Sequence, residues 1–288
     1  MAVTDEALRA IAHEALAIAH APQGRYKKHG RREEREGVML SSGDIPGPIF
    51  NKAVALSPTA SADHILAIAE AFFAGAAAGF GLMVEAEANP ALESGLRSRG
   101  WQIIDEGPAM VLPSLPARYP PLPLGLELRT VTDQTLLDEF FAVTQGEESA
   151  AEIGNEDAGS DHSVLNQFIP ANVNQILIPL ACALDPDVAL FVGYVDGTPV
   201  AHAALYRTNG VAEIGSVDVR SSQRRRGYGT ALTWAAIKEG AARGCTAAAL
   251  RATEMGYSVY RRMGFLPTCR FRTYWDPGRG IRDGGPNG

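Results

Sequence analysis

Three apolar segments joined by two tight turns restrict how the second half of this chain can fold. The segments are residues 188–195, 199–206 and 211–219. Asp196-Gly197 joins the first pair, and Asn209-Gly210 joins the second. Asp-Gly and Asn-Gly pairs favour two-residue hairpin turns because both residues tolerate positive φ. The sequence therefore predicts three antiparallel strands in series, an arrangement that fits neither of the common parallel nucleotide-binding folds.

A glycine-containing loop, residues 221–230, joins the third strand to a predicted helix and reads Ser-Ser-Gln-Arg-Arg-Arg-Gly-Tyr-Gly-Thr. A loop entering a helix presents free backbone N–H groups and the positive end of the helix dipole, so it can bind an anion. Gly227 and Gly229 lack side chains where a diphosphate would approach the backbone. The dinucleotide fingerprint is excluded because Leu232 replaces its last glycine, and no Gly-Lys-Ser/Thr of a P-loop is present. The alternative is a helix cap beside a solvated basic turn.

These residues resemble the GCN5-related N-acetyltransferase (GNAT) family, whose cofactor loop reads Arg/Gln-x-x-Gly-x-Gly/Ala after the fourth strand. Here the pattern is filled by Arg224, Gly227 and Gly229, and the resemblance covers roughly residues 126–275. It implies an α/β fold (an α+β mixed sheet), with a mostly antiparallel central sheet flanked by helices. It also implies that an amine attacks the thioester of acetyl-CoA directly, without a covalent enzyme intermediate and without a metal.

The resemblance further implies where acetyl-CoA binds. The cofactor would lie between splayed fourth and fifth strands, residues 214–219 and 246–251. Backbone groups of Val217 and Val219 would pair with the pantetheine arm, and the loop would hold the pyrophosphate. The implied cofactor-binding residues are Val217, Asp218, Val219, Arg224, Arg225, Arg226, Gly227, Tyr228, Gly229, Thr230, Thr253 and Tyr260. Thr253 departs from the family, because many relatives carry a cofactor-binding asparagine at this position.

Two residues are the main candidates for acid–base catalysis, which contributes about 10²–10⁴-fold in rate, and a third is a weaker one. Tyr260 lies where the family has the acid that protonates the CoA thiolate, and the alternative is an aromatic side chain that packs the last helix on the sheet. Glu213 on the fourth strand is the candidate base, and the alternative is an exposed strand residue. Alternation puts Glu213 on the face of Val217 unless a bulge intervenes. His202 is a weaker candidate base.

The first half of the chain repeats part of this pattern without the glycine loop. Gly100-Trp101 parallels Gly264-Phe265, since each pair follows a short arginine-containing helix and precedes a strand. When these glycines are aligned, Leu96 falls opposite Tyr260. We interpret the first half as a degenerate copy, so that the chemistry belongs to the second half. The alternative is a chance echo of a common unit.

Five prolines between residues 113 and 123 mark the expected domain boundary, because proline cannot lie in a central strand. We therefore expect two tandem GNAT-like domains. The predicted segments are a degenerate N-terminal domain over residues 1–113, a linker over 114–125, a catalytic domain over 126–276 and a flexible tail over 277–288.

Composition limits the partners of the chain. The net charge is -7, whereas a general nucleic-acid binder carries a basic excess. The three cysteines and six histidines show neither a disulfide framework nor metal-ligand spacing, which favours a reducing cytoplasm. Residues 1–23 contain acidic side chains unlike a signal peptide, and the apolar stretch 69–83 is too short to cross a membrane. We therefore expect neither a nucleic-acid partner nor a membrane.

Two functions follow from this pattern. The first is an enzyme that transfers acetyl from acetyl-CoA to a primary amine of a small molecule, and a homodimer is the oligomer considered for it. The second is a CoA-binding sensor or scaffold without turnover. Neither the acceptor amine nor the length of the acyl chain can be inferred from the sequence.

Overall fold

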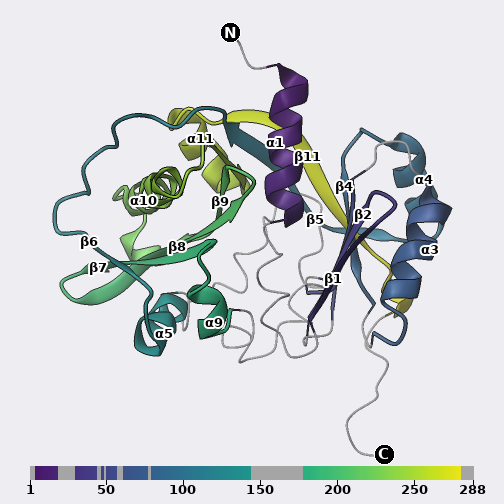
Figure 1. Ribbon diagram of the computed structural model, residues 1–288, viewed down its shortest axis with the longest axis horizontal. Coiled ribbons are helices and arrows are strands. Elements are labelled where there is room, and N and C mark those ends of the chain that lie inside the picture. Colours follow the sequence, from purple (N-terminus) through teal and green to yellow (C-terminus); the bar gives the residue numbers. More distant parts are fainter. Residues whose placement is uncertain are drawn as a thin grey trace, which may run out of the picture. The chain divides into compact units, whose positions relative to one another are not determined.

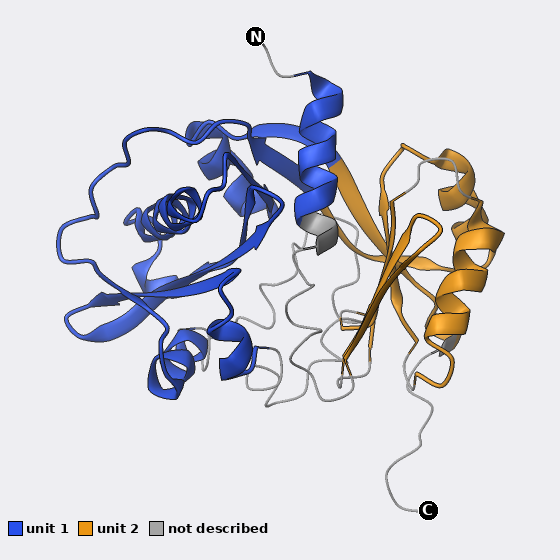
Figure 2. Cartoon of the chain, in the orientation of Figure 1, with its two compact units in different colours: residues 1–22, 108–152, 177–269 blue, residues 23–107, 153–176, 270–288 orange. Residues whose placement is uncertain are grey.

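The computed structural model of the chain describes residues 4–18, 30–43, 47–48, 50–56, 61–76, 79–143 and 178–279. The chain divides into two compact units, which Figure 2 shows in blue and orange. Unit 1 comprises residues 1–22, 108–152 and 177–269, and unit 2 comprises residues 23–107, 153–176 and 270–288. The predicted α/β class is confirmed, since the sheets are mostly antiparallel and are flanked by helices.

Unit 1 contains the three predicted antiparallel strands and the helices that pack on them (Figure 1). Its strand order is β11-β5-β10-β9-β8-β7-β6. The helix α10 packs against one face of the sheet, and α5 packs against the strands β7 and β8. The elements are α1 (Asp5–Ile18), β5 (Gln102–Leu112), β6 (Glu127–Thr130), α5 (Gln134–Ala142), α9 (Leu180–Ala183), β7 (Val188–Val195), β8 (Thr198–Thr208), β9 (Val211–Val219), α10 (Tyr228–Ala242), β10 (Ala247–Arg251), α11 (Glu254–Arg262) and β11 (Leu266–Trp275).

Both predicted hairpin turns are present. Asp196 and Gly197 have φ of 49° and 75° between β7 and β8, and Asn209 and Gly210 have φ of 39° and 82° between β8 and β9. Positive φ at both central residues gives the turn a twist that matches the strands. These turns set the antiparallel register of the sheet that carries the candidate site.

Unit 2 repeats the order of elements found in unit 1. Three antiparallel strands lead into α3, which returns to a parallel fourth strand, β4, just as β7, β8 and β9 lead through α10 to the parallel strand β10. A second helix and a long strand follow in each case. The elements of unit 2 are β1 (Arg31–Arg35), β2 (Val38–Ser42), β3 (Lys52–Ala55), α3 (Ala62–Phe72), β4 (Gly81–Glu85) and α4 (Pro90–Ser98).

Each of the two long strands, β5 and β11, has one end in unit 1 and the other end in unit 2. Residues 109–112 of β5 pair with β10 in unit 1, and residues 271–275 of β11 pair with β4 in unit 2. The strand β5, which follows the second helix of unit 2, therefore pairs with the fourth strand of unit 1. The strand β11, which follows the second helix of unit 1, pairs with the fourth strand of unit 2. The helix α1 belongs to unit 1, where it packs on β8, β9 and β10.

The second helices of the two units end in the same way. The N–H of Trp101 donates to the carbonyl of Leu96 at 3.1 Å, and the N–H of Phe265 donates to the carbonyl of Tyr260 at 3.0 Å. The intervening glycines, Gly100 and Gly264, have φ of 81° and 96°. This is the Schellman helix end, which a glycine in the left-handed conformation closes. The sequence echo is therefore also a structural one, and a common origin of the halves remains a proposal.

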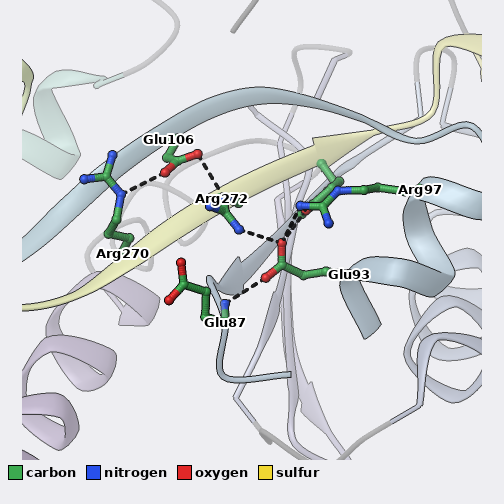
Figure 3. A network of polar contacts seen from close by, with 7 residues as sticks. Glu87, Glu93, Arg97, Glu106, Arg270 and Arg272 are labelled. Carbon is green, nitrogen blue, oxygen red and sulfur yellow. Dashed lines mark hydrogen bonds and ion pairs between the residues drawn. The ribbon is translucent and has the colours of Figure 1, made fainter. Parts of the chain in front are cut away.

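A buried polar network in unit 2 holds the end of β11 (Figure 3). The Glu93 side chain is 4% exposed and accepts hydrogen bonds from Tyr274 and, at 2.8 Å, from Arg272. Arg272 also donates to Glu106 at 2.9 Å. Burial alone would raise the pKa of both carboxyl groups, but these hydrogen bonds and the Arg272 charge hold each pKa below its usual range. The last strand is thus fixed by charge as well as by backbone pairing.

None of the described helices combines the length and the apolar character that a membrane crossing requires. The acidic segment at residues 146–163 lies outside the described residues, and so does the predicted tail beyond residue 279.

Candidate active site

A bulge divides β9 into two parts whose side chains alternate out of phase. Ala204 of β8 pairs with Gly215, and His202 pairs with Asp218, so three steps along β9 match two along β8. Ser216 between them has φ of 48°. The extra residue reverses which side chains face α10.

The bulge places Glu213 on the face opposite to Val217. Ala212 faces α10, because a Cβ built on Gly240 of that helix would lie 2.7 Å from the Cβ of Ala212. Beyond the bulge, Val217 lies 3.8 Å from the Cβ position of Gly229, which is also in α10. Glu213 alternates with Ala212 and therefore points away from α10. Alternation along the strand predicted Glu213 on the face of Val217 unless a bulge intervened. A bulge does intervene, so the candidate base is not on the face of Val217.

The strands β9 and β10 pair only at their beginning. Their parallel register runs from Val211 and Ala247 to Glu213 and Ala249. Beyond Glu213, β9 continues through the bulge to Val219. The part of β9 that the resemblance assigns to the pantetheine arm thus lies past the last residue paired with β10.

The start of α10 has no side-chain cap. Gly227 is the N-cap residue with φ of 82°, and it has no side chain that could accept a hydrogen bond from the first turn. Because successive helical residues are rotated by about 100°, Gly227 and Gly229 face opposite sides. A Cβ on Gly229 would lie 3.5 Å from Val219, whereas a Cβ on Gly227 would lie 4.0 Å from Pro123. The backbone at this helix start can therefore be approached as closely as a diphosphate requires.

The three loop arginines do not share one role. The Nε of Arg224 donates to the Val219 carbonyl at 3.2 Å, so this side chain turns back onto β9. Arg225 and Arg226 are exposed, and Arg225 has φ of 63°. Asp218 accepts the Val219 N–H at 3.0 Å. The two exposed arginines are therefore the ones available to an anion at the helix start.

The remaining residues of the implied set have structural contacts. Tyr228 is buried and packs with Leu232 in the core of unit 1, and Thr230 is half-buried. Thr253 is exposed and caps α11 by accepting the Gly256 N–H at 3.1 Å. Thr253 thus positions the helix that carries Tyr260.

Tyr260 is held as a protonated hydroxyl beside α10. Its hydroxyl is hydrogen bonded to Thr233, whose own hydroxyl donates to the Gly229 carbonyl at 2.8 Å. Burial and the charge of Asp218 raise the pKa of Tyr260 to about 12, against the opposing effect of Thr233. Tyr260 therefore remains a proton donor throughout the physiological pH range.

Two residues that support Tyr260 were not recognised in the sequence. Thr233 lies one helical turn after Gly229, a spacing at which a threonine hydroxyl can bond the earlier carbonyl. Gly256 makes room for the phenol, because a Cβ there would lie 2.8 Å from the Tyr260 ring. The spacing of Thr233 was visible, whereas the role of Gly256 depends on the rotamer of Tyr260.

Glu213 is buried on the face opposite to α10. It lies across from Tyr206 of β8, and its carboxylate oxygens are 3.5 Å from the Cβ position of Gly215. This separation is an ordinary van der Waals contact, so Gly215 and the candidate base are direct neighbours on this face.

His202 has a structural role. Its Nδ1 donates to the Phe140 carbonyl at 2.7 Å, and its ring lies 4.2 Å from that of Phe140. Burial lowers the pKa of His202, and the Asp218 charge and the Phe140 carbonyl oppose this effect. Arg220 donates to the Ala142 carbonyl at 2.9 Å. Two side chains thus satisfy carbonyls in the last turn of α5.

The proline-rich segment 113–125 belongs to unit 1. Leu115 packs against its core, and the N–H of Leu115 donates to the Thr246 carbonyl at 3.2 Å. Pro123 follows beside Gly227. We call this segment the strap.

Residues 157–265 match the model of the acetyltransferase (GNAT) family. Over this segment, less than half of the chain, the sequence is similar to the acetyltransferase domain of that family. No curated protein matches the chain significantly. A GCN5-related N-acetyltransferase from Kribbella flavida is 23% identical, with a TM-score of 0.62 over 91% of this chain and 95% of the other.

Two further solved structures have a similar fold over most of this chain. An acetyltransferase of the GNAT family from Novosphingobium aromaticivorans is 17% identical, with a TM-score of 0.52 over 91% of this chain and 96% of the other. A tandem GNAT protein from the clavulanic acid biosynthesis pathway is 14% identical, with a TM-score of 0.51 over 95% of this chain and 96% of the other. At such identities the likeness establishes the fold.

Proposed function

We propose that the chain is an acyl-CoA-dependent N-acyltransferase, which transfers acetyl from acetyl-CoA to a primary amine of a small molecule in a ternary complex. The observation that carries the proposal is the uncapped, glycine-flanked start of α10 beside the part of β9 beyond the bulge. Backbone N–H groups at a helix start bind phosphate, and the exposed Arg225 and Arg226 add charge of the required sign.

Val217 is the proposed partner of the pantetheine arm. At Val219 the N–H already donates to Asp218, and the carbonyl already accepts from Arg224. An arm that adds to β9 therefore pairs with Val217 first. Pairing with Val219 as well requires the Arg224 guanidinium to leave the carbonyl, which would free it for the diphosphate.

Tyr260 is the proposed acid of the transfer. The amine nitrogen forms a bond to the acetyl carbonyl carbon and gives up a proton to Glu213. The carbon–sulfur bond breaks, and the departing thiolate takes the proton of Tyr260. The raised pKa of Tyr260 keeps this proton on the hydroxyl at neutral pH, so that it is present when the thiolate departs.

Glu213 is the proposed base, and its position determines how the amine approaches. It lies on the face opposite to α10, whereas Tyr260 bonds to Thr233 of α10. The two groups therefore act from opposite faces of the sheet. The amine would approach on the Glu213 side and meet the thioester where β9 is no longer paired with β10.

Substitution of Gly227 tests the proposal. Glutamate at this position would strain a left-handed residue and place a carboxylate on the anion site. We expect Gly227→Glu to weaken CoA binding at least about 100-fold in calorimetric titration, and to abolish thiol release from acetyl-CoA with an amine panel. Gly244→Glu is the matched control, because Gly244 is a left-handed glycine beyond the other end of α10 with open space around it.

The outcomes separate the two functions. Parent-like CoA binding by Gly227→Glu would show that the loop does not hold the cofactor. Tight CoA binding by the parent without thiol release to any amine would support the sensor or scaffold in place of the enzyme.

A further inference from the structure

The strap runs along α10 in the direction opposite to the helix. Tyr119 packs edge-on against Trp234 in the middle of α10, with ring centroids 6.0 Å apart. Four residues later, Pro123 lies 4.0 Å from the Cβ position of Gly227 at the helix start. Figure 1 shows this segment as the teal loop that passes around α10. The strap therefore ends at the proposed diphosphate site.

Two leucines on either side of Pro123 point into solvent. Leu122 is 44% exposed and Leu124 is 101% exposed, and they are among the few large apolar side chains that are exposed in the described part of the chain. Prolines at 121 and 123 restrict the backbone around Leu122, so this apolar surface is held in place. Pro123 between the two leucines lies beside Gly227, which directly follows the exposed Arg225 and Arg226 in the sequence.

The helix start separates two sides of the diphosphate site. Gly229 faces Val219 of β9, and Gly227 faces Pro123 of the strap. The pantetheine arm would occupy the β9 side. The other end of CoA, which carries the adenosine, therefore leaves the helix start toward the strap.

We propose that Leu122 and Leu124 form the contact surface for the adenine ring of CoA, so that the strap adds nucleotide recognition to the GNAT domain. The inference rests on the proposed function. The faces of an adenine ring are apolar, and burying them against leucine removes apolar surface from water. The neighbouring Arg225 and Arg226 offer partners for the phosphate on the ribose.

Calorimetric titration with two ligands tests the proposal. CoA carries the adenosine portion, and 4′-phosphopantetheine lacks it. In the double variant Leu122→Ser/Leu124→Ser we expect the Kd for CoA to rise about tenfold, while the Kd for 4′-phosphopantetheine stays unchanged. Leu184→Ser is the matched control, because this leucine at the end of α9 is 52% exposed and should leave both constants unchanged.

Each outcome decides the proposal. If the double variant keeps the parent ratio of the two constants, the strap does not contact the nucleotide, although the parent's CoA binding still supports the proposed function. If the parent binds neither ligand, both proposals fail. A change of oligomeric state at parent CoA affinity would make the leucines a self-association surface and overturn the inference. Leu124→Ser alone, at a fully exposed site, repeats the test should the double variant unfold.

Discussion

Units 1 and 2 share an order of elements but differ at the start of the helix that leads to the parallel fourth strand. In unit 1 this helix is α10, which begins at Gly227 without a side-chain cap. In unit 2 it is α3, where the Ser61 hydroxyl accepts the His64 N–H at 3.2 Å and Asp63 adds an acidic side chain to the first turn. The N–H groups that an anion would need are therefore already partly satisfied and screened in unit 2.

The second helices differ in the same sense. In unit 1, Tyr260 is half-buried and bonds to Thr233, whereas Leu96 at the corresponding helix end in unit 2 is fully buried in the core. Asp63 is further paired with Arg99 of α4. The same frame thus carries an open anion site with a proton donor in one unit, and a closed, apolar equivalent in the other. The comparison favours unit 1 as the place of the proposed acyl transfer, and it can be tested from both sides.

The largest effect is expected in unit 2, where the polar network lies and no acyl transfer is proposed. Arg272→Met would leave Glu93 and Glu106 without their shared cation in a buried setting. Breaking such a pair from one side costs about 3–5 kcal/mol, and we expect a loss of about 3 kcal/mol in urea unfolding. Arg97→Met is the matched control, because the Arg97 side chain is 53% exposed, and it should cost under about 1 kcal/mol. Equal losses would mean that the network does not hold β11.

In unit 1 the corresponding prediction concerns Tyr260. Tyr260→Phe removes the proposed proton donor but keeps the ring that packs on Phe265. We expect kcat to fall about 100-fold, equivalent to about 2.7 kcal/mol, with CoA affinity unchanged. Tyr257→Phe, one turn earlier on α11, should keep the parent kcat. A fall in CoA affinity instead of kcat would make Tyr260 a packing residue like Leu96.

Local chemistry explains what could be predicted from the sequence. The hairpins depend on Asp196-Gly197 and Asn209-Gly210, whose preferences act within four residues. The helix end shared by the two units depends on single glycines and could be aligned without any tertiary information. Such short-range sequence preferences were enough to predict the fold class and the order of elements.

Long-range pairing explains what could not be predicted. The sequence does not reveal that β5 and β11 each complete the sheet of the other unit, because strand partners are chosen by tertiary packing. One extra residue near Ser216 reverses the alternation of β9, so the face of Glu213 depends on the exact position of the bulge. The inward turn of Arg224 likewise depends on the Val219 carbonyl, which only the folded loop brings near.

A smaller effect is expected when acid titrates the network in unit 2. The pKa values of Glu93 and Glu106 are lowered in the folded state, so the unfolded chain binds more protons as the pH falls. Their contribution to stability is therefore present above the unfolded pKa of about 4.3 and is lost as the pH falls through the folded values. Urea unfolding midpoints measured from about pH 6 to pH 3 should fall less steeply in Glu106→Gln than in the parent. Parallel curves would show that Glu106 does not contribute to the acid response.

The smallest effect concerns the capped helix start of unit 2. Ser61→Ala removes the hydroxyl that accepts the His64 N–H, and loss of such a cap costs about 1 kcal/mol of stability. Asp63 and its ion pair with Arg99 remain, so the opened helix start still repels an anion. We expect one CoA per chain by calorimetry in both parent and variant. A second CoA bound by Ser61→Ala would mean that a single hydrogen bond, rather than the charge of the first turn, separates the two units.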